Sequence, residues 1–132
     1  MNQPFNSAKH RIVVVCIMLI IGVLHVINLK SHLHGAWFIL YISYFSDFIL
    51  PIAAYFLFYL VESHFPFFKN WCMKMVLAFL IPSFAETCQY LSIPLLGVTF
   101  DTLDYLAYAL GATMAVLIDR QILPRLLPFW TA

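Results

Sequence analysis

The chain has 132 residues, of which 64% are hydrophobic, 17% aromatic and only 10% charged. Soluble domains carry about 25% charged residues, and a chain of this length could not bury so much apolar surface in one aqueous core. The composition therefore predicts an integral membrane protein. The net charge of +1 gives no electrostatic basis for binding nucleic acid. No zinc-ligand spacing or glycine-rich phosphate loop indicates a cofactor.

The first apolar run covers residues 12–29 and follows a polar leader that ends in basic residues. A membrane core of about 30 Å requires about 20 helical residues, so this run is long enough to cross it. No small-residue cleavage site precedes Lys30, which argues against a secretory signal peptide. We expect a retained first span.

The second run covers residues 37–61 and is interrupted by Asp47 and Pro51. It is longer than one straight span requires, and two interpretations are open. A short interfacial segment could precede a span that starts near Ser46, with Ser46 or Asp47 as its cap. Alternatively, one tilted helix could be kinked near Pro51. We favour the first interpretation.

A polar hinge at residues 62–70 leads to the third predicted span, residues 71–91, which contains Pro82. Residues 92–100 then form an uncharged loop with helix-breaking Pro and Gly, which we expect to lie over the rim of its neighbours. The fourth span covers residues 102–118. The tail after it, residues 119–132, contains Phe129 and Trp130, which are suited to anchoring at the membrane interface.

The basic residues predict the orientation of these four spans. In a four-span chain, six of the seven fall on one side and only Lys30 on the other. The positive-inside rule then places both termini in the cytoplasm. We expect one all-α domain over residues 1–132, a four-transmembrane-helix bundle of a bacterial inner (plasma) membrane. The six residues on one side are Lys9, Arg11, Lys69, Lys74, Arg120 and Arg125.

This orientation brings the polar residues of the spans to one depth. An ionisable residue inside a membrane segment is costly and indicates a functional site. All of the polar residues of the spans fall in the outer half of the membrane, and the cytoplasmic half carries almost no polar residue. Four separate segments contribute to this set, which comprises His25, Asn28, Asp47, Glu86, Gln89, Asp101 and Asp104.

Helical spacing places these residues on packed faces. Glu86 and Gln89 are neighbours on one helix face, and Tyr108 and Gly111 continue the spacing of the two following acids. Gly111 and Ala115 form a small-xxx-small pattern that permits close helix packing. We predict an outward-facing polar cavity that binds a ligand. Its residues would be Glu86, Gln89, Asp101, Asp104, Asp47, His25 and Tyr108.

Each of these residues also has a structural alternative. Asp101 and Asp104 begin a helix, where aspartate is favoured by capping and by the helix dipole. Gln89 could simply hydrogen-bond Glu86, and a histidine such as His25 is often a helix–helix contact. These alternatives stay open at the level of the sequence.

The pattern Glu86-x-x-Gln89, a loop with Pro and Gly, then Asp101-x-x-Asp104 and Gly111 resembles that of VanZ-like membrane proteins. Asp47 also matches the acid near the start of the preceding span in that family. The resemblance covers residues 44–118 and is greatest to divergent members. No basic residue lies between the Gln and the second Asp, where most members carry an arginine. The resemblance implies a membrane bundle with an outer polar site, in a family associated in some members with glycopeptide (teicoplanin) resistance.

The function that we expect is binding of a lipid-linked or cell-wall ligand, with the lipid bilayer as the other partner. A proton- or cation-coupled transporter, a structural partner subunit and a membrane enzyme that uses the acids with a divalent metal are alternatives. No nucleophile–base pair at a recognisable spacing indicates catalysis, so no catalytic residue and no cofactor are assigned. The metal and the oligomeric state are left open.

Overall fold

The computed structural model describes residues 8–27, 29–93 and 101–130. The described residues form helices and turns, and none of them forms a strand. Four helices are long and apolar enough to cross a membrane, the last of them counted through the turns that follow it to Leu126. This confirms the prediction of an all-helical fold with four helices able to span a membrane, as expected of a multi-pass membrane protein. The four are α1 (Ala8–Val26), α2 (Ala36–Val61), α3 (Trp71–Tyr90) and α4 (Thr102–Leu117).

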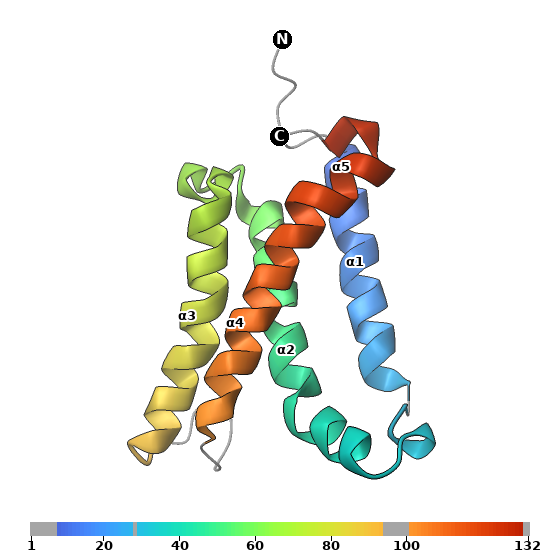
Figure 1. The fold of residues 1–132 in the computed structure, drawn as a ribbon. Coiled ribbons are helices and arrows are strands. Elements are labelled where there is room, and N and C mark those ends of the chain that lie inside the picture. The colour runs from blue at the N-terminus through green and yellow to red at the C-terminus, as the bar shows by residue number, and fades with distance from the viewer. Residues whose placement is uncertain (1–7, 28, 94–100, 131–132) are drawn as a thin grey trace.

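Helices α2 and α4 form the centre of the bundle (Figure 1). Helix α3 packs against both, and α1 packs against α2 on the other side. The starts of α1 and α3 and the helices after α4 lie at one end (Figure 1). The short elements are η1 (Leu29–His32), η2 (Pro66–Lys69), the π-helix η3 (Ile118–Ile122), α5 (Leu123–Leu126) and η4 (Pro128–Trp130).

Helix α2 is one continuous helix from Ala36 to Val61. The predicted helix cap at Ser46 or Asp47 is therefore wrong, because Asp47 lies within the helix. At 1.5 Å per residue such a helix is about 39 Å long, more than a membrane core requires. It contains Pro51, which neighbouring helices make tolerable in a membrane span. Figure 1 shows the first turns of α2 bent away from the rest.

Gly111 on α4 lies against the backbone of α2 beside this proline. A Cβ at residue 111 would overlap the carbonyl oxygen of Phe48 and lie 3.3 Å from Cγ of Pro51. Only glycine therefore permits this approach without a shift of one helix. One turn further along, Ala115 is fully buried. The predicted close-packing face of α4 is confirmed.

Local caps fix the turn between α3 and α4. The chain leaves α3 through Ser92, whose φ is +62°, and the amide of Ile93 donates to the carbonyl of Cys88 at 2.8 Å, an arrangement typical of helix C-termini. Asp101 then caps α4, because its side chain accepts a hydrogen bond from the amide of Leu103. Residues 94–100, most of the predicted rim loop, lie outside the described part of the chain.

Candidate functional site: an acidic cluster at one end of the bundle

Four acids meet where α3 ends and α4 begins, and we call Asp47, Glu86, Asp101 and Asp104 the acidic cluster. Glu86 lies at its centre and is only 4% exposed. Its Oε1 accepts the backbone N–H of Asp101 at 3.1 Å. The hydroxyl of Tyr108 lies 3.4 Å from Oε2 of Glu86 and 3.4 Å from Oδ1 of Asp47. The Asp104 carboxyl group lies beside those of Asp47 and Glu86.

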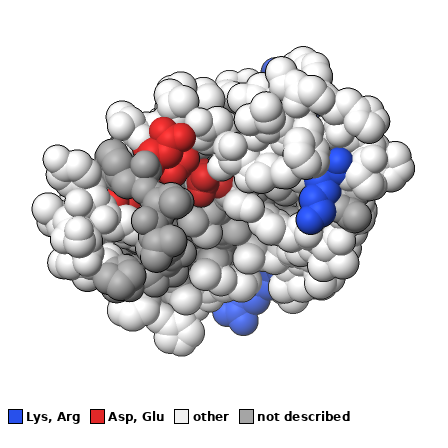
Figure 2. All heavy atoms as spheres, turned by 90° about the horizontal axis from the view of Figure 1, so that it is seen from below, with Lys and Arg blue, Asp and Glu red and all other residues white. Residues whose placement is uncertain are grey.

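The outer part of the cluster is open to the surface. Asp101 is exposed, and its carboxylate accepts hydrogen bonds from the hydroxyl of Tyr44 at 2.9 Å and from the amide of Leu103 at 3.0 Å. Figure 2 shows the acidic side chains gathered in one place on this end of the molecule, with the visible basic side chains elsewhere. The cluster is thus buried at Glu86 and reachable at Asp101.

The acidic cluster has no basic counterpart. Among the described residues, no lysine, arginine or histidine forms an ion pair with any of its four carboxyl groups. Like charges in contact repel one another, and the effect is stronger away from water. The cluster therefore favours binding of a proton or of a cation, and disfavours an anion.

One predicted site residue, His25, lies apart from this arrangement. His25 is exposed on α1, where its Nδ1 hydrogen-bonds the carbonyl of Ile21 at 3.2 Å and its ring centroid lies 5.6 Å from that of Phe45. The structure shows no contact between His25 and the cluster. Gln89 is half-buried one turn beyond Glu86 on α3. Asn28 lies outside the described residues.

The cluster does not form a compact metal-binding group. In residues 8–27, 29–93 and 101–130, no three His, Cys, Asp or Glu side chains are arranged so that they could hold one metal ion. The carboxylates reach one another through Tyr108 and through pairwise contacts instead of converging on a single point.

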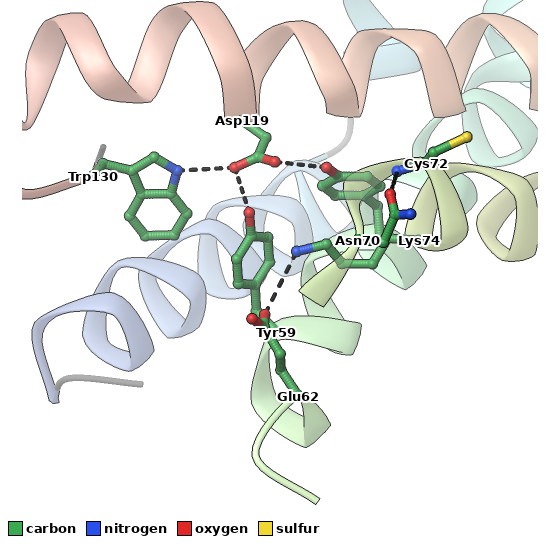
Figure 3. A network of polar contacts seen from close by, with 8 residues as sticks. Tyr59, Glu62, Asn70, Cys72, Lys74, Asp119 and Trp130 are labelled. Carbon is green, nitrogen blue, oxygen red and sulfur yellow. Dashed lines mark hydrogen bonds and ion pairs between the residues drawn. The ribbon is translucent and has the colours of Figure 1, made fainter. Parts of the chain in front are cut away.

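A second polar region lies at the opposite end of the bundle, and the sequence did not indicate it. Asp119 in η3 is 3% exposed. Its carboxylate accepts hydrogen bonds from the hydroxyls of Tyr55 at 2.6 Å and Tyr59 at 2.5 Å, and from the indole N–H of Trp130 at 2.9 Å. Figure 3 shows the Asp119 carboxylate between the side chains of Trp130 and Tyr59. Three donors thus satisfy one buried carboxylate.

Lys74 and Glu62 complete this region, which we call the Asp119 network. The ammonium of Lys74 is 3.5 Å from Oε2 of Glu62 and lies over the ring of Tyr59, 3.1 Å from its centroid. Lys74 is 1% exposed. Burial raises the pKa of the Glu62 carboxyl, and the neighbouring Lys74 ammonium opposes that shift.

The Asp119 network corrects three expectations. The end opposite the acidic cluster is not free of buried polar groups, and Lys74 is a buried ion-pair partner instead of an exposed flanking charge. Trp130 is 1% exposed and therefore does not anchor at the membrane interface. Its ring packs against His10, with centroids 4.9 Å apart. The sequence feature that could have indicated this region is the pair Tyr55 and Tyr59, which lie four residues apart on one buried face of α2.

Comparison with known proteins identifies no relative. No family model, curated protein or solved structure matches the chain.

Proposed function

We propose that the protein is a VanZ-like, multi-pass inner-membrane protein that binds an envelope ligand at the acidic cluster on the extracytoplasmic face. One observation carries the proposal. Four carboxyl groups from three helices meet at one end of the bundle, and no basic side chain among the described residues pairs with them. Carboxyl groups placed together without cationic partners lower the stability of the fold, and such costly arrangements are typical of ligand-binding sites.

The distribution of exposed basic residues supports the proposed orientation. Five of them lie at the end of the bundle opposite the acidic cluster, in the first turn of α1 or in the short elements η2, η3 and α5, and Lys30 in η1 lies at the other end. Removing buried Lys74 from the count leaves the asymmetry in place. The positive-inside rule then assigns the end with Lys9, Arg11, Lys69, Arg120 and Arg125 to the cytoplasm.

The surroundings of the cluster favour a ligand with an apolar part. Large hydrophobic side chains near the cluster are exposed on α3 and α4, where lipid would cover them in a membrane. These are Phe84, Tyr90, Leu91, Leu103 and Leu106. A lipid-linked molecule could place its apolar chain along these side chains and its polar group at the carboxylates.

Complementation of a deletion strain tests this function. We expect Glu86→Gln and Asp104→Asn proteins to reach the membrane at the level of the unaltered protein, because both changes remove charge without removing volume. We expect neither to restore envelope integrity or teicoplanin tolerance. Growth under envelope stress and teicoplanin would be measured together with the amount of folded protein in membranes.

The matched control is the double variant Glu62→Gln with Lys74→Met, which neutralises a buried ion pair at the opposite end. We expect it to complement at equal amounts of folded protein. Full complementation by Glu86→Gln and Asp104→Asn would refute the proposed function.

A second candidate is a proton-coupled transporter, favoured by polar groups at both ends of the α2–α4 pair. Tyr108 joins the acidic cluster, and Asp119 binds Tyr55 further along the same two helices. Between them, Gly111 closes tightly on the backbone of Phe48, so transport would require these helices to separate. If this candidate is correct, proteoliposomes that contain the full chain will show pH-dependent proton flux, and Asp104→Asn will abolish that flux. Absence of any flux would remove this candidate.

A further inference from the structure

The end of the bundle opposite the acidic cluster carries exposed cations and no exposed acidic side chain. The chain has six acids. Four of them form the acidic cluster, and the other two, Glu62 and Asp119, are buried within the Asp119 network. The exposed charged side chains of this end are therefore all basic, and such a surface fits an anionic partner. They are Lys9, Arg11, Lys69, Arg120 and Arg125.

Two of these cations lie around one corner of the bundle, where α3 begins and η3 follows α4. The guanidinium carbon of Arg120 in η3 is 6.0 Å from the ring centroid of Trp71, the first residue of α3. Lys69 ends η2 two residues before Trp71. Lys69 acts electrostatically on Glu62, and Arg120 acts on Lys74, the ion-pair partner of Glu62. We call Lys69, Trp71 and Arg120 the basic corner.

The protein does not neutralise the exposed cations of the basic corner. Among the described residues, neither Lys69 nor Arg120 forms an ion pair with an acid. The charge of Arg120 also repels the buried ammonium of Lys74, and a bound anion would offset this repulsion. A guanidinium matches the geometry of a phosphate with two parallel hydrogen bonds. A phosphate-bearing group is therefore the anion that this corner fits.

Apolar side chains beside the corner favour a lipid as the source of the phosphate. The ring of Trp71 is exposed at the start of α3, and Phe65 and Phe67 are exposed in the turns before it. Met73 and Val76 continue the exposed apolar surface along the first turns of α3. Aromatic side chains at the end of a span are typical of the membrane–water interface, where cations reach the lipid headgroups. A phospholipid could place its headgroup at the cations and its acyl chains along α3.

We propose that the basic corner binds the headgroup of an anionic phospholipid, with Arg120 and Lys69 contacting its phosphate and Trp71 lying at the level of the interface. The site is at the end of the bundle opposite the acidic cluster, so it goes beyond the proposed function and does not depend on it.

Two phospholipids that differ in net charge test the proposal. The full chain is placed in nanodiscs that contain equal amounts of anionic phosphatidylglycerol and zwitterionic phosphatidylcholine, and the retained lipids are measured by native mass spectrometry. Each cation near an anionic lipid should contribute about fivefold to the preference. We expect phosphatidylglycerol to be retained over phosphatidylcholine by at least about tenfold. Arg120→Gln should reduce the preference by about fivefold, and the double variant Lys69→Gln with Arg120→Gln should abolish it.

Two matched controls each remove one exposed cation elsewhere. Lys30→Gln lies in η1 at the other end of the bundle. Lys9→Gln lies at the same end but on α1, which is on the opposite side of α2 and α4 from α3 (Figure 1). Both variants should keep the preference, and a loss in Lys9→Gln as large as that in Arg120→Gln would overturn the assignment to the basic corner.

Added glycerol phosphate distinguishes a lipid from a soluble phosphate as the ligand. Retained phosphatidylglycerol that glycerol phosphate does not displace supports the lipid, whereas its displacement would overturn the lipid source. Equal retention of the two lipids by the unaltered protein, or an unchanged preference in the double variant, would overturn the proposal.

Discussion

The two polar regions of the bundle contain similar groups but are built in opposite ways. The Asp119 network pairs charges with donors or with an opposite charge: Asp119 accepts from three donors, and Lys74 forms an ion pair with Glu62, whose Oε2 has no hydrogen-bond partner among the described residues. The acidic cluster places carboxyl groups beside other carboxyl groups, with no cation paired to them among the described residues. Both regions adjoin the pair α2 and α4, but the Asp119 network also uses the turns that follow α4.

This difference indicates which region stabilises the fold. A buried carboxylate with complete hydrogen bonding holds its surroundings together, whereas contacts between like charges oppose folding. The Asp119 network also ties the C-terminal turns to α1, because Trp130 packs on His10. We therefore assign a structural role to the Asp119 network, and the contrast supports the ligand-binding role that we propose for the acidic cluster.

Removal of one charge from the Asp119 network should have the largest effect. Lys74→Met leaves Glu62 buried without its cation, and we expect a loss of about 3–5 kcal/mol in the free energy of unfolding. Unfolding in SDS, followed by circular dichroism, would measure it. The double variant Lys74→Met with Glu62→Met should regain most of the loss, since a hydrophobic pair can replace a buried ion pair. A double variant as unstable as the single one would contradict this assignment.

The contact between α2 and α4, halfway between the two regions, should give the next largest effect. A methyl group at Gly111 would meet the carbonyl of Phe48, so Gly111→Ala should lower the free energy of unfolding by about 2 kcal/mol. Gly22→Ala on α1 is the control, because a Cβ there meets no atom within 4 Å. Equal stability of the two variants would show that the helices do not approach each other this closely.

A smaller effect is expected from the indole of Trp130. Trp130→Phe removes one of three donors to Asp119 and keeps most of the ring packing, so we expect a loss of about 1 kcal/mol. Trp37→Phe is the matched control, since Trp37 is 73% exposed and should leave the free energy of unfolding unchanged. If both variants behave alike in the SDS titration, the hydrogen bond to Asp119 contributes nothing.

The acidic cluster could be predicted from the sequence because its residues are anomalous there. Glu86 and Asp104 lie in apolar runs, and antiparallel spans joined by a short loop bring the end of one next to the start of the next. The same reasoning included His25, which depth alone placed near the cluster, although the structure directs it to Ile21 and Phe45. Depth in a membrane is readable from sequence, but the direction in which a side chain points between helices is not.

The Asp119 network could not be predicted because its charges look ordinary in the sequence. Glu62, Lys74 and Asp119 lie near the ends of apolar runs, where charged residues are expected at the membrane interface. Their burial depends on the π-helix that continues α4 and on the turns that bring Trp130 back to the bundle. Neither feature has a local sequence signal. The close approach of Gly111 to Pro51 within the continuous helix α2 likewise has no local sequence signal.

The most direct test of the contrast between the two regions is the free energy of unfolding of Asp104→Asn and Asp119→Asn, measured in one SDS titration series. The side-chain amide introduced by Asp104→Asn can donate to the neighbouring carboxylates, so this variant should be more stable than the unaltered protein by about 1 kcal/mol. Asp119→Asn replaces an acceptor of three donors, and it should be less stable by about 2 kcal/mol. A loss of stability in Asp104→Asn as large as that in Asp119→Asn would contradict the account, because both regions would then be structural.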